Sequence, residues 1–415
     1  MTTAFFTTHE QVLAIRKEFG TPVYVYDQKT LEAAADDVLA FPNAFGLTAR
    51  YAMKALPTAA IVRLFAKKGL HIDASSGHEA ERAIRAGVDP TRIQLTAQQA
   101  PVNLKELVEQ GVWYTACSLN QLDLYGRLFP GTEVTVRINP GLGSGHNNRT
   151  NVGGPSSAFG IWHEHLPEVL EIQRTHNLKL TRMHTHVGSG GDPAVWDLCA
   201  RMSLSIAAKL PEVNRLSLGG GYKVGRMPGE QTTDLKAIGA PVVKDFEQFA
   251  REHGRELHLE VEPGTYLVGN AGALLCDVMD VIDTGDDGYH FIKTDSGMTE
   301  LLRPSMYGAQ HPMVLVGDGE GDTTRDYLVV GHCCESGDLL TPELGNPEAL
   351  DPRTFPIAHI GDTLVIGGAG AYSSGMSAKN YNSFPECAEV MIESDGAPKL
   401  IRKRQTLDQI IVNEI

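Results

Sequence analysis

The sequence has 415 residues, of which 42% are hydrophobic and 21% are charged, and its formal net charge is −15. This composition is typical of a folded globular protein, and the length predicts two domains, because single cores stop growing beyond about 250–300 residues. The negative charge argues against nucleic acid and anionic membranes as partners, because both would repel the chain.

The N-terminal residues MTTAFFTTHEQ contain neither a basic segment nor a long apolar one. We therefore expect no signal peptide, and no apolar run is long enough to span a bilayer. The six cysteines form no CxxC pair, which argues against a structural zinc and a disulfide framework. Reduced thiols in a cytoplasmic protein are the expectation.

From about residue 45 to residue 265, short apolar runs alternate with amphipathic helical stretches such as TAAIVRLFAKKG, GHEAERAIRAG and NLKELVEQG. The strand-like runs are GLTARYAMKA, HIDAS, RIQLT, WYTACS, TEVTVRINP, LTRMHTHVGS, VNRLSLGGG and ELHLEVEPG. This alternation predicts a (β/α)8 barrel. An open doubly wound sheet is the alternative, but no GxGxxG fingerprint follows the first strand.

After about residue 270 the pattern changes to strand-like runs separated by Gly, Pro and Asp turns. These runs predict an antiparallel β domain, either a β-sandwich or a Greek-key barrel. The early segment TPVYVYD is also strand-like and is expected to join this domain. We therefore predict a barrel over residues 28–268 and a β domain formed by residues 1–27 and 269–415.

Polar residues stand at the ends of several predicted barrel strands, where (β/α)8 enzymes build their active sites. They are Lys54, Asp73, His184, His186, the glycines Gly219, Gly220 and Gly221, and Glu262. Lys54 follows an apolar strand, so a desolvated amine that forms an imine is one interpretation and a lysine reaching for solvent is the other. The three glycines fit either a phosphate or a tight turn.

Glu262 could pair with a protonated pyridine nitrogen or form a structural salt bridge. The His184 and His186 pair could bind a metal, although we favour His186 as a ring that stacks on a planar cofactor. The HEH sequence at 163–165 indicates a solvated helix start, and no metal is expected. In the β domain, HCCESGD and GGAGAYSSGMSAKNYNS are polar loops of the kind that often serve function.

Taken together, these motifs resemble the diaminopimelate decarboxylase family, within the fold-type III group that includes alanine racemase and ornithine decarboxylase. The matching stretches are YAMKALP, DASSGHE, FGI, HTHVGS, LGGGY, EPG, LLRPSMYGAQHP, CESGD and GAYSSGMSAKNYNS. They run in order from about residue 50, and KLIRKRQT near residue 404 also looks like the last strand of the family.

The resemblance implies pyridoxal 5'-phosphate as cofactor and a head-to-tail homodimer with shared active sites. Lys54 would hold the cofactor as an imine, Glu262 would pair with its ring nitrogen, and His186 would stack on the ring. The other implied cofactor-binding residues are Asp73, Ser189, Gly219, Gly220, Gly221, Gly264, Thr265 and Tyr372, with Tyr372 supplied by the partner subunit.

The implied reaction is decarboxylation of meso-2,6-diaminopimelate to L-lysine and CO2, with catalysis by Lys54, Cys334, His186 and Glu262. Cys334, from the partner subunit, would protonate the α-carbon as a general acid, whereas the adjacent Cys333 is interpreted as structural. Arg303 would grip the distal carboxylate, and Glu335 would receive the distal ammonium. Tyr307 and Tyr372 complete the expected substrate contacts.

One departure from the family pattern affects the substrate. The family usually has arginine directly after EPG, where this chain has Thr265. Losing a charge-assisted contact costs roughly 1.5–3 kcal/mol unless another cation replaces it, and Arg149 in the unusual 141–158 segment is one candidate. This departure supports a related decarboxylase of another amino acid or amino-acid conjugate, for example in a siderophore pathway or acting on D-ornithine or lysine.

Three further alternatives remain at this point. A racemase on the same barrel would need a second-face tyrosine in place of the CESGD loop. A regulatory homologue without catalysis conflicts with the joint presence of Lys54, Glu262, Cys334 and Tyr372. A metal-dependent barrel hydrolase would show bound metal and no visible absorption band.

Overall fold

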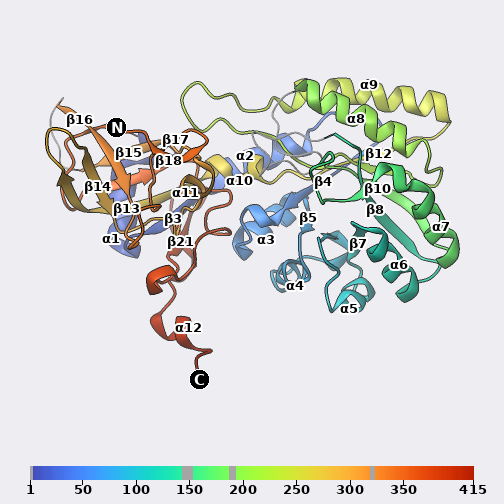
Figure 1. The fold of residues 1–415 in the computed structure, drawn as a ribbon, viewed down its shortest axis with the longest axis horizontal. Coiled ribbons are helices and arrows are strands. Elements are labelled where there is room, and N and C mark those ends of the chain that lie inside the picture. The colour runs from blue at the N-terminus through green and yellow to red at the C-terminus, as the bar shows by residue number, and fades with distance from the viewer. Residues whose placement is uncertain (1–2, 143–152, 187–192, 318–322) are drawn as a thin grey trace. The chain divides into compact units, whose positions relative to one another are not determined.

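The computed structural model describes residues 1–415 except 1–2, 143–152, 187–192 and 318–322 (Figure 1). The chain divides into two compact units. The barrel unit comprises Glu32–Val224 and Gln231–Leu267, and the β unit comprises Met1–Leu31, Gly225–Glu230 and Val268–Ile415. In the described part of the chain, no helix is long and apolar enough to cross a membrane.

The barrel unit contains eight parallel strands that close on themselves, because β10 pairs with both β11 and β8. In barrel order they are β10 (Lys179–His184), β11 (Arg215–Ser217), β12 (His258–Val261), β4 (Leu47–Ala52), β5 (His71–Ala74), β6 (Ile93–Thr96), β7 (Trp113–Ala116) and β8 (Glu133–Asn139). The short β9 (Ile161–Trp162) extends from β8. The predicted (β/α)8 barrel is confirmed, and the open doubly wound sheet is excluded.

Helices follow the strands in the alternation that the sequence predicts. They are α2 (Gln28–Leu39, which begins in the β unit), α3 (Ala59–Lys68), α4 (Gly77–Arg85), α5 (Leu104–Glu109), α6 (Leu119–Leu128), α7 (Leu166–His176), α8 (Pro193–Ala207), α9 (Leu235–His253) and α10 (Thr265–Val268). Local signals set their ends: Ser76 caps α4 by accepting the Glu79 N–H, and α3 ends at Gly69 in the left-handed region. Each βα unit is therefore defined locally by its own sequence.

One layer of the barrel is built from charges rather than from apolar side chains. Glu260 of β12 accepts hydrogen bonds from Arg50 of β4 and from Arg182 of β10, and all three residues are buried. The Arg182 guanidinium also lies 4.6 Å from the centre of the Trp113 ring. Removing one partner of a buried ion pair costs about 3–5 kcal/mol, so this layer fixes the strands on which the site is built.

The β unit contains a sheet in the order β19-β16-β14-β13-β3-β21-β22; β20 pairs with β13, and β15 pairs with β20. Its strands are β3 (Val23–Asp27), β13 (Gly272–Asp283), β14 (His290–Thr294), β15 (Met313–Val316), β16 (Thr324–Val330), β19 (Arg353–Pro356), β20 (Thr363–Ile366), β21 (Ala388–Ile392) and β22 (Pro398–Arg402). TPVYVYD forms β3 between β13 and β21, as predicted. Most pairs are antiparallel, but β3–β21 and β14–β16 are parallel, so the sheet is mixed.

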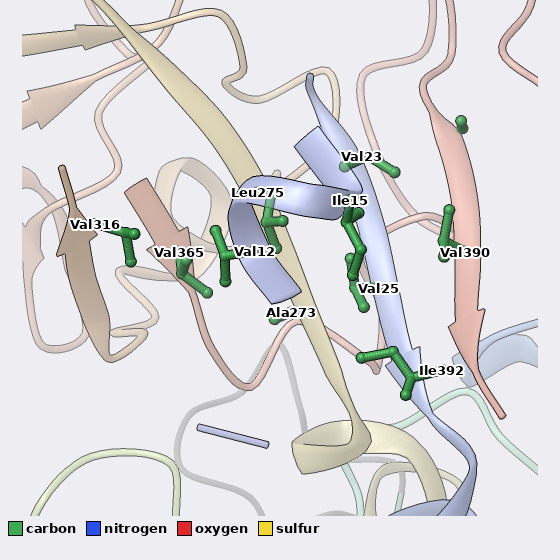
Figure 2. Close-up of a cluster of buried hydrophobic side chains, with 11 residues drawn as sticks. Val12, Ile15, Val23, Val25, Ala273, Leu275, Val316, Val365, Val390 and Ile392 are labelled. Atoms are coloured by element: carbon green, nitrogen blue, oxygen red, sulfur yellow. The ribbon is translucent and has the colours of Figure 1, made fainter. Parts of the chain in front are cut away.

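The core of the β unit lies between helix α1 (His9–Phe19) and this sheet. Figure 2 shows Val12 and Ile15 of α1 beside Val25 of β3 and Leu275 of β13, and all four are buried. Strand β13 carries a register shift between Val278 and Asp280, where its pairing passes from β20 to β14. Its two halves therefore belong to two parts of the sheet.

Several short elements complete the described chain. They are β1 (Thr3–Ala4), β2 (Thr7–Thr8), β17 (Pro342–Glu343), β18 (Asn346–Leu350), α11 (Arg303–Tyr307), α12 (Leu407–Ile411) and the 3-10 turns η1 (Met53–Ala55), η2 (Pro90–Arg92), η3 (His163–His165), η4 (Gly269–Ala271) and η5 (Tyr381–Ser383).

Candidate active site

The barrel brings the predicted polar residues to the carboxyl ends of its strands. Lys54 lies in η1 directly after β4, and Asp73 lies in β5 beside it. His184 ends β10, and Glu262 follows β12. Because the carboxyl ends of parallel strands meet at one end of a barrel, these four strand ends contribute to one cluster.

Glu262 lies at the centre of this cluster, and its carboxylate is held by three side chains. Gln94 Nε2 donates to Oε1 over 2.8 Å, Ser217 Oγ donates to Oε1 over 2.9 Å, and His184 Nε2 lies 2.7 Å from Oε2. Oε1 therefore has both of its acceptor positions filled, whereas Oε2 retains one. The interpretation of Glu262 as part of a structural salt bridge accounts for only one side of the carboxylate.

The two buried carboxyl groups of the cluster have different acidities. Burial raises the pKa of Glu262, but His184, the charge of Arg50 and the hydrogen bond from Gln94 together outweigh burial and hold that pKa below its usual range. Burial, followed by the negative charge of Glu262, raises the pKa of Asp73 to about 7, although the charge of Lys54 opposes this. Glu262 is therefore the stable anion of the pair, and Asp73 is the group that carries a proton near neutrality.

The glycine segment after β11 lies against His186 and the backbone of Glu262. Gly219 and Gly221 have positive φ angles of 72° and 99°. A Cβ on Gly220 would lie 2.3 Å from the Glu262 carbonyl oxygen, so no other residue fits there. The Gly220 N–H donates to His186 Nδ1 over 3.2 Å. Burial and the charge of Arg137 lower the pKa of His186 well below its ordinary value, which keeps the ring neutral and fits a stacking role.

Of the two interpretations of Lys54, the single chain agrees with the lysine that reaches solvent and not with the desolvated amine. Lys54 is exposed although Met53 and Ala55 on either side of it are buried. The reason is local: η1 turns the chain at the end of β4, so the lysine leaves the barrel wall while its neighbours stay in it. Its charge still lowers the pKa values of Asp73 and His186, so the amine acts on the cluster electrostatically.

The cluster fits an aromatic cofactor that carries a phosphate. Around Glu262, the buried atoms without a hydrogen-bond partner among the described residues include Gln94 Oε1, Arg137 Nη2 and His184 Nδ1. They surround the anionic Glu262 and leave unused hydrogen-bonding capacity for a polar ligand. The glycine segment provides space that any side chain would fill, and Lys54 offers an accessible amine.

The predicted loop motifs of the β unit form a second cluster. Cys334 is exposed, and its N–H donates to Asn382 Oδ1 over 2.9 Å, which joins the CESGD loop to the KNYNS segment. Asp338 accepts the N–H groups of Met298 (2.6 Å) and Cys333 (2.9 Å). Burial raises the pKa of Cys333 to about 12, so the neighbouring Cys334 is the accessible thiol of the two.

The predicted substrate-binding residues also lie in the β unit. Arg303 opens α11, and its guanidinium is 6.0 Å from the centre of the Tyr307 ring. Tyr372 has a φ of 56°, which is uncommon for a bulky residue and typical of functional sites. Glu335 is exposed and lines an open hollow together with Ser305, Lys379 and Tyr381.

Sequence reasoning missed three residues of the barrel cluster, Gln94, Arg137 and Ser217, and also the orienting role of His184. Each polar side chain lies inside an apolar strand and alternates with core residues, which is the only signal that could have found them. Gly264 lies 3.3–3.4 Å from Ala52 and Ala55 when a Cβ is built on it, so the EPG turn packs closely on η1.

Two of the predicted residues cannot be placed in the site. Ser189 and Arg149 lie outside the described residues. Among the residues that the structure does describe, no group of three or more His, Cys, Asp and Glu side chains could hold a metal ion. The HEH sequence forms the turn η3 and leads into α7, with His165 paired to Glu168 at 3.0 Å on the surface.

Comparisons with known proteins agree with this site. Residues 32–269 match the family model of the pyridoxal-dependent decarboxylase pyridoxal-binding domain. The chain is 35% identical to diaminopimelate decarboxylase of Escherichia coli K12 over 98% of this chain and 97% of the relative. It is 37% identical to the Streptomyces coelicolor enzyme of that name, over 98% and 92%.

Solved structures extend the likeness to the whole fold. A crystal structure of diaminopimelate decarboxylase superposes with a TM-score of 0.92 at 34% identity, covering 100% of this chain and 98% of the other. The Helicobacter pylori enzyme of that name in complex with L-lysine shares the fold, with a TM-score of 0.85 at 24% identity over 98% and 99%.

The closed barrel, its lysine and its matched cofactor-binding domain define the class as pyridoxal-dependent decarboxylases. Within this class, the chain belongs to the diaminopimelate decarboxylase family.

Proposed function

We propose that this protein decarboxylates meso-2,6-diaminopimelate to L-lysine and CO2, as a pyridoxal-phosphate-dependent carboxy-lyase of lysine biosynthesis. One observation carries the proposal: similarity to diaminopimelate decarboxylases over nearly the whole chain. The candidate residues in each unit support it, because Lys54 and Glu262 suit the cofactor and Arg303 and Glu335 suit an amino acid with a second charged end.

In the barrel unit, Lys54 would hold the cofactor covalently, and Glu262 would accept a hydrogen bond from its protonated ring nitrogen. His184, Gln94 and Ser217 keep Glu262 ionised and oriented, so that hydrogen bond does not depend on rearrangement. Pyridoxal phosphate, when bound, supplies an electron sink for the pair of electrons left by the departing carboxylate. Gly219–Gly221, Ser189, Gly264 and Thr265 are the proposed phosphate neighbours.

In the β unit, the exposed thiol of Cys334 is the proposed proton donor to the α-carbon. The hydrogen bond from its N–H to Asn382 and the turn closed by Asp338 hold this thiol in a fixed loop. Glu335 would receive the distal ammonium and Arg303 the distal carboxylate. These contacts would discriminate diaminopimelate from amino acids with an uncharged end.

We further propose a homodimer in which each active site takes residues from both subunits. The family resemblance supports this assignment, with Cys334, Glu335 and Tyr372 as the residues that a partner would supply. The cytoplasmic location stays a prediction from the sequence.

Release of CO2 from a panel of amino acids tests the function. We expect turnover of meso-diaminopimelate and little or none of D-lysine, L-lysine, D-ornithine, L-ornithine or diaminobutyrate, because none of these has a distal carboxylate. Lys54→Ala serves as the inactive control for background decarboxylation. Activity on lysine or ornithine without activity on diaminopimelate would contradict the substrate assignment.

Thr265 supports one second candidate, a sister decarboxylase of another amino acid or conjugate. The family arginine is absent at this position. A substrate without a distal carboxylate makes no contact with that arginine, so its binding would not suffer from the change. The same panel decides between the two, since the sister enzyme would turn over D-ornithine, lysine or diaminobutyrate instead.

A further inference from the structure

Arg226 belongs to a short segment, Gly225–Glu230, that groups with the β unit although barrel-unit residues flank it on both sides in the sequence. Its Nε donates to the Gly368 carbonyl oxygen over 3.1 Å, and its backbone N–H donates to Glu230 over 2.8 Å. A Cβ on Gly368 would lie 2.8 Å from Arg226 Cδ, so only glycine admits this approach. Both the backbone and the side chain of Arg226 are therefore held by hydrogen bonds.

Arg226 and Arg303 form a pair of neighbouring cations in the β unit. Burial lowers the pKa of Arg226 to about 9, and the positive charge of Arg303 is the next cause. His311 lies near the same two charges: burial, then Arg226 and Arg303, keep its pKa well below the ordinary value. His311 and Arg226 also contact neighbouring carbonyl groups, since His311 Nδ1 lies 3.0 Å from the Gly367 oxygen and Arg226 Nε lies 3.1 Å from the Gly368 oxygen.

The Glu230 carboxylate lies near Arg226, where it accepts the backbone N–H groups of Arg226 and Met227, and the side chains of this cluster keep unused hydrogen-bonding capacity. Arg226 Nη2, Arg303 Nε and His311 Nε2 are buried atoms without a hydrogen-bond partner. Among the residues with a described placement, neither guanidinium forms an ion pair with a carboxylate. Burying one unpaired charge is costly, and burying two like charges side by side is more so. Such an arrangement persists where a negatively charged ligand binds between the cations.

We propose that Arg226 is a specificity-determining residue that binds the distal carboxylate of the substrate together with Arg303. It would supply the cation that the family places directly after EPG and that this chain lacks at Thr265. This inference rests on the proposed function, since it assumes a substrate with a second carboxylate. It also replaces Arg149 as the candidate for the compensating cation.

Two inhibitors that differ only in the distal carboxylate can probe this contact. L-Lysine keeps the distal carboxylate of diaminopimelate, whereas 1,5-diaminopentane is the same chain without it. In the wild type, L-lysine should therefore inhibit at much lower concentration than 1,5-diaminopentane. Loss of one charge-assisted contact corresponds to roughly 10- to 100-fold in affinity.

The test compares wild type, Arg226→Gln and the double variant Arg226→Gln with Thr265→Arg. For Arg226→Gln we expect KM for diaminopimelate to rise by roughly 10- to 100-fold with a smaller change in kcat, because the contact is uniform binding. The inhibition constant of L-lysine should rise by a similar factor, and that of 1,5-diaminopentane should not change. Restoring the family arginine at 265 should recover part of the KM.

Two controls separate this effect from misfolding and from loss of cofactor. Arg325→Gln removes an exposed guanidinium of the same unit and should leave every parameter unchanged. The visible absorption of the bound cofactor and the melting temperature should be retained in Arg226→Gln. Loss of cofactor in that variant would assign Arg226 to the phosphate instead and overturn the proposal.

The outcomes also distinguish this inference from the proposed function. A wild type that does not decarboxylate diaminopimelate contradicts the proposed function. A wild type that does so, with an Arg226→Gln variant whose KM and lysine inhibition are unchanged, contradicts only the role of Arg226.

Discussion

At the scale of single residues, the barrel cluster is organised around keeping one carboxylate ionised in a buried place. A lone buried carboxylate would take up a proton, because burial disfavours its charged form. Glu262 avoids this through hydrogen bonds from Gln94 and Ser217 and the contact with His184. Asp73 also accepts a hydrogen bond from Gln94, over 3.3 Å, but burial and the charge of Glu262 outweigh it and raise the pKa of Asp73 to about 7.

Cys334→Ala tests the proposed proton donor. We expect kcat to fall by about 10²–10⁴-fold, which is the usual contribution of a positioned general acid, while the absorption band of the bound cofactor persists. The band and CO2 release are measured on the same preparation. Cys333→Ala is the matched control and should keep most of the activity, and a Cys334→Ala enzyme with normal turnover would remove the thiol from the mechanism.

At the scale of elements, the residues before the CESGD loop form a buried polar network in the β unit. Glu300 accepts hydrogen bonds from Ser296 (3.1 Å) and Thr299 (2.6 Å), and Thr299 also contacts His332. The His332 ring stacks on Phe384 with centroids 3.5 Å apart. This network connects the segment 296–300, which precedes α11, to His332, two residues before Cys334.

Glu300 gives this network a defined pH dependence. Burial raises the pKa of Glu300 to about 7, whereas an exposed glutamate has a pKa near 4.5. The folded state therefore binds the proton more tightly, so stability falls as pH rises from about 4.5 to 7 and levels off above that. His332, with a pKa lowered to about 4 by burial, acts in the opposite direction between pH 4 and 6.5.

Thermal unfolding of wild type and Glu300→Gln at pH 5 and pH 8 measures the Glu300 contribution. We expect the wild type to lose roughly 3 kcal/mol relative to the variant between these pH values, since each pKa unit is worth about 1.4 kcal/mol. Because the variant keeps His332, the histidine contribution cancels in the comparison. An equal pH dependence for both proteins would show that Glu300 ionises normally.

Much of the architecture at this scale was predictable from local sequence. All eight barrel strands were identified, because apolar runs and glycine-ended helices alternate without interruption. Strands β15 and β19 and helix α12 were missed, because their short segments lack a clear period. Helix α1 was also missed, although the capping box of Thr8 and Gln11 and the buried pair Val12 and Ile15 mark it. The interior positions of Gln94 and Ser217 depend on strand register, which the sequence does not state. Arg226 could not be assigned, since its segment leaves the barrel unit for six residues.

At the scale of the whole molecule, the account assigns cofactor attachment and proton donation to different units of the chain. Lys54 belongs to the barrel unit, whereas Cys334 and Arg303 belong to the β unit. The proposed homodimer combines these contributions from two chains. Active sites shared between two chains follow from this dimer, and mixed dimers of two variants can test for them.

Hybrid dimers make that test. Neither Lys54→Ala nor Cys334→Ala should be active alone. When both chains are co-expressed, one site of each mixed dimer would combine an intact Lys54 with an intact partner Cys334. Random pairing then gives roughly a quarter of the wild-type activity. No recovery in a preparation that demonstrably contains mixed dimers would mean that each chain supplies its own thiol.

The covalent link between Lys54 and pyridoxal phosphate is the claim on which the mechanism depends. Borohydride reduction of the purified protein, followed by peptide mass spectrometry, tests it most directly. The account predicts loss of the visible absorption band and a phosphopyridoxyl group on the peptide that contains Lys54. An unmodified Lys54 peptide, with the label on another lysine or on none, would contradict it.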